Sequence, residues 1–527
     1  MHGEYSLTMR SLIGNVSLVS GLTITSRLLG LLRDVLFFTC FGVSLIGDAF
    51  ILAFTIPNLF RRMLGEGTLS SAFIPVYSEK IKSGQIDKAQ QILNQVLSRL
   101  VVFLFGLSIF ICLFSWATST LGWVNEPKWV NGLDLNSIVF PYVFLICVSA
   151  IMVGALNVHG KFFAGAFSPI ILNFSMIGIL AFCYFVISWR EIKLATALCF
   201  AVLVGGAFQM IWPWFQLRSS FDWKWKIDFS SSVGMEKIKS LFVVGVFGAA
   251  VGQVNIMVSR FLAYSLENEG ALSYLFLSAR LIELPLGVFA LSISTVFFPE
   301  LSRTFSSGQT LEYQRYFARG FRLTLAITLP AAIGLALLAN LILSVLFQWG
   351  EFGQGDVVIA SDVLLISCIA LPFYALAAFF VKAFHSQKEM RVPLNAAIFS
   401  FVVNLLLSLL LMQYFGMFGL AWANVISAIV QTIYLAVKLG FFKSKSFVSK
   451  SDFCFRSIIV SSLVMFLVLW FVNQMEYINS GKWDSTFGLM VTIPLGVLVY
   501  AVCLIYLGFP DLQKIRDKIF FIPFNKK

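Results

Sequence analysis

The stretch Ser26-Arg27-Leu28-Leu29-Gly30-Leu31-Leu32-Arg33-Asp34 places three charged side chains inside a long apolar run, residues 11–41. A helix needs about 20 apolar residues to span a bilayer, so this run can cross a membrane with its charges at membrane depth. A charged side chain that faces lipid at the bilayer centre costs about 2.5 to 3.5 kcal/mol. We therefore expect these charges to face a water-filled interior.

The rest of the chain has the composition of a membrane protein. Of its 527 residues 59% are hydrophobic and only 12% charged, and the mean hydropathy is +0.88, whereas soluble domains carry about 25% charged residues. Apolar windows predict an all-α polytopic membrane protein with fourteen transmembrane helices. The predicted spans are residues 11–41, 45–62, 95–117, 137–158, 165–187, 194–217, 240–262, 271–297, 320–347, 357–381, 393–413, 417–437, 457–474 and 486–508.

The basic residues indicate how these spans are oriented. Because the number of spans is even, both termini are expected on one side, and the loops of that side hold 30 of the 38 Lys and Arg residues. Lys and Arg accumulate in cytoplasmic loops, so both termini are predicted to be cytoplasmic. The net charge of +12 is then mainly an orientation signal, and we expect no nucleic-acid partner. The opposite loops hold only Lys128, Arg190, Lys193 and Lys482.

Short patterns recur at offsets of 224 to 233 residues, which indicates an internal repeat. The matching pairs are Ser26-Arg27-Leu28-Leu29 with Ser259-Arg260-Phe261-Leu262, Pro57 with Pro285, Ile74-Pro75 with Phe298-Pro299, and Asn173 with Asn404. Parallel six-helix lobes fit an alternating-access transporter; chance recurrence of common membrane dipeptides is the alternative. The predicted parts are an N-lobe at 1–218, a cytoplasmic linker at 219–239, a C-lobe at 240–440, and two further helices with a cytoplasmic tail at 441–527.

The charges left inside the spans are the candidate functional groups. Four lipid-facing arginines would together cost on the order of 12 kcal/mol, so they are expected to line an aqueous interior. The bases inside the spans are Arg27, Arg33, Arg260 and Arg280, and the acids are Asp34, Asp48 and Glu283.

Helical spacing predicts which of these charges are neighbours. Arg27 and Asp34 are seven residues apart and share one helix face, while Arg33 is expected to point about 120° away. Arg280 and Glu283, three residues apart, are again expected to be neighbours.

The second span should carry a polar stripe. Asp48, Thr55 and Arg62 recur every seven residues, which gives an acid at the outer end and a base at the inner end. Pro57 removes one backbone hydrogen bond there and is expected to bend the helix.

Two interpretations of the charged residues are open. They are either intramembrane ion pairs that fix helix packing, with Arg61 and Arg62 reaching to the interface, or the lining of a functional cavity, which the clustering favours. The planar guanidinium of arginine can donate two parallel hydrogen bonds to the oxygens of one phosphate group. We therefore expect a phosphate-bearing or otherwise anionic cargo.

These residues resemble the signature of a known family. The motifs are Ser26 to Asp34, Asp48-Ala49-Phe50, Ile56-Pro57-Asn58-Leu59-Phe60-Arg61-Arg62, Glu66-Gly67, Ala72-Phe73-Ile74-Pro75 and Arg280-Leu281-Ile282-Glu283-Leu284-Pro285-Leu286-Gly287. They look like those of the MurJ (MviN) family, which are lipid II flippases of the multidrug/oligosaccharidyl-lipid/polysaccharide exporter superfamily. The predicted layout of spans agrees over essentially the whole chain.

The resemblance implies a function and a set of residues. It implies export of lipid II, the undecaprenyl-diphosphate-linked peptidoglycan precursor, across the bacterial cytoplasmic (inner) membrane. The exporter is expected to be a monomeric transporter among membrane lipids, not an enzyme, and to need no cofactor. Helices thirteen and fourteen are similar to a pair that forms a groove for the lipid tail. Substrate-binding roles are implied for Arg27, Arg33, Arg61, Arg62 and Arg280, and gating or ion-pair roles for Asp34, Asp48, Arg260 and Glu283.

Sodium coupling and other functions remain as alternatives. Some family members look sodium-coupled through acids in helices seven, eleven and twelve, but this chain has only amides there, such as Gln253, Asn255, Asn404 and Asn424, which more often make packing hydrogen bonds. The runner-up function is export of another lipid-linked oligosaccharide or of drugs. An enzyme acting on prenyl phosphates is disfavoured because no paired-acid or catalytic motif occurs, and a channel is disfavoured by the paired lobes.

Overall fold

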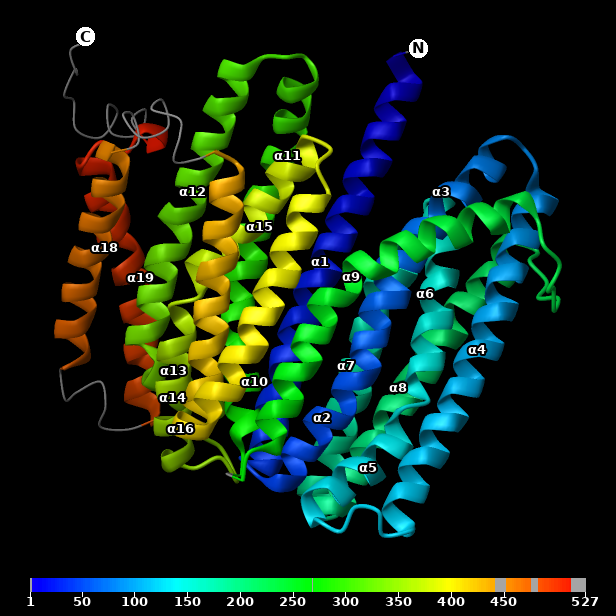
Figure 1. Ribbon diagram of the computed structural model, residues 1–527, viewed down its shortest axis with the longest axis horizontal. Helices are drawn as coiled ribbons and strands as arrows, with labels where there is room; N and C mark the ends of the chain where they lie inside the picture. The colour runs from blue at the N-terminus through cyan, green and yellow to red at the C-terminus, as the bar shows by residue number, and fades with distance from the viewer. Residues whose placement is uncertain (1, 268, 441–451, 475–481, 513–527) are drawn as a thin grey trace. The chain divides into compact units, whose positions relative to one another are not determined.

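The computed structural model describes residues 2–267, 269–440, 452–474 and 482–512, and within those ranges the chain is all-helical, without a strand (Figure 1). This confirms the predicted all-α class for the described chain. The helices from the first half are α1 (His2–Phe41), α2 (Leu45–Phe60), η1 (Arg61–Thr68), α3 (Leu69–Lys82), α4 (Ile86–Thr120), α5 (Pro127–Val139), α6 (Tyr142–Val158), α7 (Phe163–Ala181), η2 (Phe182–Val186), α8 (Glu191–Phe221) and α9 (Val233–Ser265). The others are α10 (Ala271–Pro285), η3 (Leu286–Ala290), α11 (Leu291–Ser306), α12 (Thr310–Leu337), α13 (Ala339–Phe347), α14 (Gln354–Cys368), α15 (Leu371–Ser386), α16 (Arg391–Lys438), α18 (Asp452–Asn473), α19 (Lys482–Tyr506) and η5 (Pro510–Leu512).

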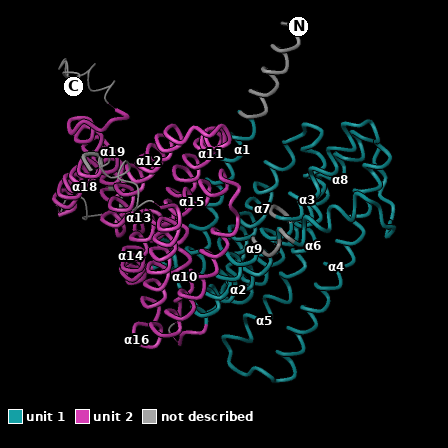
Figure 2. Tube along the Cα trace, turned by 45° about the horizontal axis from the view of Figure 1, so that its top comes forward, with its two compact units in different colours: residues 1–264, 349–352 teal, residues 265–348, 353–527 magenta. Residues whose placement is uncertain are grey.

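The helices fall into two compact units, coloured separately in Figure 2. Unit 1 comprises residues 1–264 and 349–352, and unit 2 comprises residues 265–348 and 353–527. Contacts therefore place α9 with the helices that precede it as far as Tyr264. The lobes predicted from the repeat, with their linker at 219–239, stay a prediction.

Ten helical segments of the described chain are long and apolar enough to cross a membrane. One of them, Arg391–Lys438, is broken at Gly416 (φ 54°, ψ −129°), between the two spans predicted at 393–413 and 417–437. The spans predicted at 11–41, 45–62 and 240–262 coincide with α1, α2 and α9, which are helical but lie outside those ten. The chain is thus a multi-pass membrane protein, and the count of fourteen stays a prediction.

Two predicted spans change helix type directly after a proline. Pro57 lies in the last turn of α2, which passes into the π-helix η1 at Arg61, and Pro285 ends α10, which passes into the π-helix η3 at Leu286. Proline removes one backbone donor and crowds the preceding turn, and π-helical turns occur frequently at functional sites. The expected disturbance at Pro57 is therefore a change of helical register, and the same change at the matching proline favours the repeat.

The interior of unit 1 is held by buried polar bonds as well as apolar packing. Gln209 of α8 is only 2% exposed, and its side chain donates to the Ser168 carbonyl at 2.7 Å and accepts from the Tyr142 hydroxyl at 3.1 Å. The Ser149 hydroxyl donates to the Gln209 carbonyl at 2.6 Å. Because every one of these groups is satisfied, the network fixes how α6, α7 and α8 pack.

Unit 2 has an aromatic core and a carboxylate anchor. Phe297, Phe317, Phe321, Phe379 and Phe380 pack together from α11, α12 and α15. Residues of α19 and η5 are tied to the same α12: Arg319 contacts Asp511 of η5 at 2.6 Å, and the Tyr500 hydroxyl of α19 donates to the Ala326 carbonyl at 2.6 Å. These two elements are therefore fixed to α12 by polar contacts in addition to apolar ones.

The short loop 349–352 lies against the end of α1 within unit 1. The Glu351 amide donates to the Thr39 carbonyl at 2.9 Å, and buried Phe352 packs edge-on against Phe38, with ring centroids 5.7 Å apart. Gly350 has φ +56°, and a Cβ there would collide with the Thr39 carbonyl oxygen. Glycine is needed for both the backbone angle and the close approach.

We expect Gly350→Ala to lower stability by about 1–3 kcal/mol, because the substitution combines a left-handed backbone angle with a backbone collision. The measurement is the midpoint of thermal unfolding of the purified protein in one detergent. Gly84→Ala is the matched control, because Gly84 has φ +73° and open space around its Cβ position. Equal losses in the two variants would contradict the close approach.

Candidate functional site

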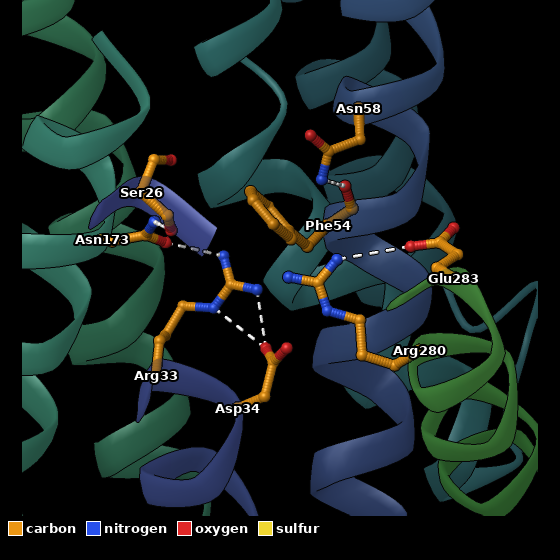
Figure 3. A network of polar contacts seen from close by, with 8 residues as sticks. All are labelled: Ser26, Arg33, Asp34, Phe54, Asn58, Asn173, Arg280 and Glu283. Carbon is orange, nitrogen blue, oxygen red and sulfur yellow. Dashed lines mark hydrogen bonds and ion pairs between the residues drawn. The ribbon is translucent and has the colours of Figure 1, made fainter. Parts of the chain in front are cut away.

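Arg33 and Asp34, on α1, form a buried ion pair (Figure 3). Arg33 Nη2 and Nε donate to Asp34 Oδ1 at 2.6 and 3.1 Å, and Arg33 Nη1 donates to Asn173 Oδ1 of α7 at 3.1 Å. The Asn173 amide in turn donates to the Ser26 carbonyl at 3.2 Å. The side chains of Arg33 and Asp34 are 15% and 4% exposed, so this cation and its partner are largely removed from solvent.

The pairing within α1 differs from the one predicted by helical spacing. Arg33 was expected to point away from the face of Asp34, but its long side chain reaches sideways to its chain neighbour. Arg27 is exposed and has no hydrogen-bond or ion-pair partner within the described chain, while Asp34 is taken by Arg33. The guanidinium of Arg27 is therefore available to a ligand, whereas that of Arg33 already holds a carboxylate.

Asp48 and Thr55 of α2 are buried, and Thr55 is hydrogen-bonded to a residue of α9. Asp48 is fully buried in the first turn of α2, where the helix dipole favours a negative charge. Two helical turns after Asp48, Thr55 is 1% exposed and accepts a hydrogen bond from Arg260 Nη1 at 2.5 Å. Arg62, by contrast, is exposed in η1. The predicted stripe is thus buried at Asp48 and Thr55 and exposed at Arg62.

A buried lysine lies at the start of α5 in unit 1, where a loop residue was expected. Lys128 belongs to the first turn of α5 and is 7% exposed, with its ammonium 5.0 Å from the ring centroid of Tyr264. The Tyr264 hydroxyl donates to the Lys128 carbonyl, and Trp129 packs edge-on against the same ring at 4.9 Å. Nothing in local spacing reveals this contact, because 136 residues separate Tyr264 from Lys128.

Arg61 lies beside a polar cavity of unit 1. Its Nε donates to Asn58 Oδ1 at 3.3 Å, and the cavity, of about 340 Å³, is also lined by Ser149, Asn157 and Ser168. Arg61 is half-buried. The π-helical turn thus presents one arginine to the interior of the unit and the next, Arg62, to its surface.

Unit 2 contributes one of the predicted charged pairs. Arg280 Nη1 lies 3.3 Å from Glu283 Oε2 on α10 (Figure 3), as the three-residue spacing predicts. The two side chains are 32% and 50% exposed. A pair this accessible can exchange its partner for a ligand at less cost than a buried pair.

The amides of the two halves of α16 bond to one another. Asn404 is 1% exposed, and its Nδ2 donates to Asn424 Oδ1 at 2.9 Å and to Ser427 Oγ at 3.3 Å. These are the packing hydrogen bonds that were predicted. A sodium site built on carboxylates does not fit these two helical segments, since neither contains an acid.

Charged groups buried at membrane depth in a multi-pass helical protein are characteristic of transporters, because such groups are otherwise too costly to keep. The chain matches the family model "Lipid II flippase MurJ" over residues 37–492. It belongs to the lipid II flippase MurJ family.

Relatives and solved structures agree with this assignment. The chain is 32% identical to a probable lipid II flippase MurJ of Buchnera aphidicola subsp. Acyrthosiphon pisum, over 87% of this chain and 89% of the relative. It is 30% identical to one from Vibrio cholerae serotype O1, over 96% and 98%. A solved lipid II flippase MurJ in an inward closed conformation has a TM-score of 0.75 and 27% identity, covering 95% of this chain and 99% of that one.

A more distant likeness extends to the superfamily. An inward-facing multidrug resistance MATE family transporter of the MOP superfamily has a TM-score of 0.66 and 13% identity, covering 81% of this chain and 99% of that one. At this identity the likeness shows the fold alone. It agrees with the predicted superfamily fold and says nothing of the cargo.

Asp34→Asn should destabilise the protein by about 3–5 kcal/mol, because it leaves the buried Arg33 cation without its carboxylate. The measurement is the free energy of unfolding in a denaturant titration. Arg303→Gln is the control: the Arg303–Glu300 pair has a similar 2.6 Å separation but is exposed, so its loss should cost about 1 kcal/mol or less. Equal effects would show that the Arg33–Asp34 pair does not behave as buried.

Proposed function

We propose that this protein flips lipid II from the inner to the outer leaflet of the bacterial cytoplasmic membrane. The observation that carries the proposal is the family membership: relatives named as probable lipid II flippases align over almost the whole chain at 30% and 32% identity. The substrate is amphiphilic, with a charged diphosphate-sugar headgroup and a long prenyl chain. A transporter for it needs a polar place for the headgroup while the chain stays in lipid.

The arginines at membrane depth supply the chemistry for the headgroup. A guanidinium gives two parallel donors to phosphate oxygens, and a hydrogen bond between charged groups is worth about 1.5–3 kcal/mol. Arg27 is exposed and Arg280 is about one-third exposed, which suits groups that receive a ligand. In this proposal Arg27, Arg33, Arg61, Arg62 and Arg280 bind the diphosphate-sugar headgroup.

The acids and Arg260 have a different role in the proposal. Asp34 holds Arg33, Glu283 holds Arg280, and Arg260 bonds to Thr55 in the helix that contains Asp48. The two ion pairs neutralise Arg33 and Arg280 while no substrate is present, and the hydrogen bond to Thr55 satisfies one donor of Arg260. Arrival of the diphosphate would exchange carboxylate for phosphate at the accessible Arg280, which releases Glu283 as a gating group.

The transport cycle we propose is alternating access by a monomer with fourteen spans and cytoplasmic termini. Two parallel six-helix lobes rock about the headgroup site, and the helices that follow them guide the prenyl chain. The membrane potential is a sufficient driving force, since moving one net charge through 100 mV yields about 2.3 kcal/mol. Carboxylate-based sodium coupling is not part of the proposal.

Arg27→Ala and Arg280→Ala should each weaken lipid II binding by about tenfold or more, the equivalent of one charge-assisted hydrogen bond. The measurement is a titration of the purified protein with lipid II in detergent. Arg303→Ala is the control, because it removes an exposed arginine outside the predicted spans. Unchanged affinity in the first two variants would contradict the site.

A cellular assay tests the function apart from the site. Depletion of the protein, followed by a leaflet-specific assay of lipid II, should stop the precursor from appearing on the outer face. Continued appearance would overturn the flippase proposal. Loss of drug or other oligosaccharide export without loss of lipid II flipping would favour the alternative exporter.

A further inference from the structure

The segment between α8 and α9 is bound along α4 within unit 1. Residues 222–232 are neither helix nor strand, yet their backbone is bonded to α4 at three levels. The Asn94 amide donates to the Lys224 carbonyl at 3.3 Å, the Ser98 hydroxyl accepts from the Asp228 amide at 3.0 Å, and Arg99 Nη2 donates to the Phe229 carbonyl at 2.7 Å. The segment is therefore a fixed surface feature (Figure 1, beside α4).

Apolar and charged residues alternate along this segment. Its apolar residues are Trp223, Trp225, Ile227 and Phe229, and its charged residues are Lys224, Lys226 and Asp228. Trp223 is buried and packs edge-on against Trp214. The exposed fractions of the next three apolar residues are 37% for Trp225, 74% for Ile227 and 55% for Phe229. The apolar row thus begins inside the protein and continues onto its surface.

The bonded face of α4 becomes a lipid-facing surface further along the helix. Asn94, Ser98, Val102, Phe105 and Ile109 follow one another at steps of three or four residues and so share one helix face. The first two bond the segment, whereas the last three are exposed apolar residues, 59%, 57% and 46% exposed. The exposed apolar residues of the segment therefore lie beside the start of an exposed apolar face of α4, since Phe229 is bonded to Arg99.

The length of α4 sets the depth of the segment. The helix has 35 residues, or about 52 Å at 1.5 Å per residue, whereas the hydrocarbon core of a bilayer is about 30 Å thick. About 20 residues of α4 cross that core, and apart from Ile86 in the first turn the exposed large apolar ones begin at Val102. Ser98 and Arg99, and with them residues 228–230, then lie at the headgroup level.

We propose that residues 223–229 form an interfacial anchor that binds the phosphate groups of anionic phospholipids in the leaflet beside the inner end of α4. Ile227 and Phe229 enter the boundary between headgroups and acyl chains, and Trp225 lies among the headgroups, where tryptophan is favoured. Lys224 and Lys226, both exposed, contact the phosphates. The anchor rests on the proposed orientation but not on lipid II recognition.

The charge arm of the test compares two double variants of the full-length protein. Lys224→Gln/Lys226→Gln should lower the affinity for phosphatidylglycerol by about tenfold or more, since each lysine near an anionic surface contributes about fivefold, and should leave phosphatidylcholine binding unchanged. Native mass spectrometry of the protein titrated with each lipid measures both. Lys82→Gln/Lys88→Gln is the control, because it removes the same charge from the same unit. Lys88 lies about 16 Å from Arg99, toward the start of α4 and so away from the proposed headgroup level.

The depth arm uses a spin label in vesicles of phosphatidylglycerol and phosphatidylethanolamine. A label at Ile227→Cys should be relaxed more by oxygen, which partitions into lipid, than by a water-soluble nickel chelate. Ser83→Cys, in the turn after α3, should show the reverse. The signal from the chain's own eight cysteines is measured on labelled protein that carries neither substitution.

Three results would overturn the proposal. The first is phosphatidylglycerol binding that is unchanged in the Lys224/Lys226 variant, and the second is an equal loss in the Lys82/Lys88 variant. The third is a label at position 227 that is as accessible to nickel as the label at position 83, which would assign the exposed row to a soluble protein partner instead. Lipid II binding serves as the separate readout for the proposed transport function and should be the same in both lysine variants.

Discussion

The cost of keeping charge at membrane depth is the constraint on which the rest of this structure depends. A cation removed from water is tolerated only with a partner close by, and two of the partners here also tie helices together. Arg33 joins α1 to α7 through Asn173, and Arg260 joins α9 to α2 through Thr55. The charges that a ligand would use therefore also set how the helices around them are rotated.

Helical spacing predicted the elements well because each one is determined by its own residues. The apolar windows are mostly helical in the described chain, although those at 320–347 and 357–381 are each divided between two helices. Arg280 and Glu283 are neighbours because residues three apart on a helix lie on the same face. Spacing failed for Arg33, since the side chain of arginine is long enough to leave the face on which its Cβ lies. It could not reveal Asn173 as a partner, because the two residues are 140 positions apart.

Lys128 shows the same limit at the end of a span. Counting loop charges predicts that it lies in a loop with few other basic residues, and the count treats each of these residues as exposed. Its ammonium instead lies over the Tyr264 ring under a shell of aromatic side chains. Burial of this kind depends on which helix ends meet, and only the packing of α5 against α9 determines that. The candidate site was thus predictable in its residue types and only partly in its partners.

The end of the first predicted repeat and the end of the first compact unit fall at different places in the chain. Matching patterns put the boundary between residues 218 and 240, because the second copy of the pattern starts there. Contacts put it after Tyr264, because α4 satisfies the backbone of residues 222–232 and Tyr264 holds the far end of α9 to α5. A segment whose backbone groups are bonded to a helix cannot move freely without breaking those bonds. The boundary of unit 1 after Tyr264 therefore follows from contacts between distant residues, which sequence patterns alone do not single out.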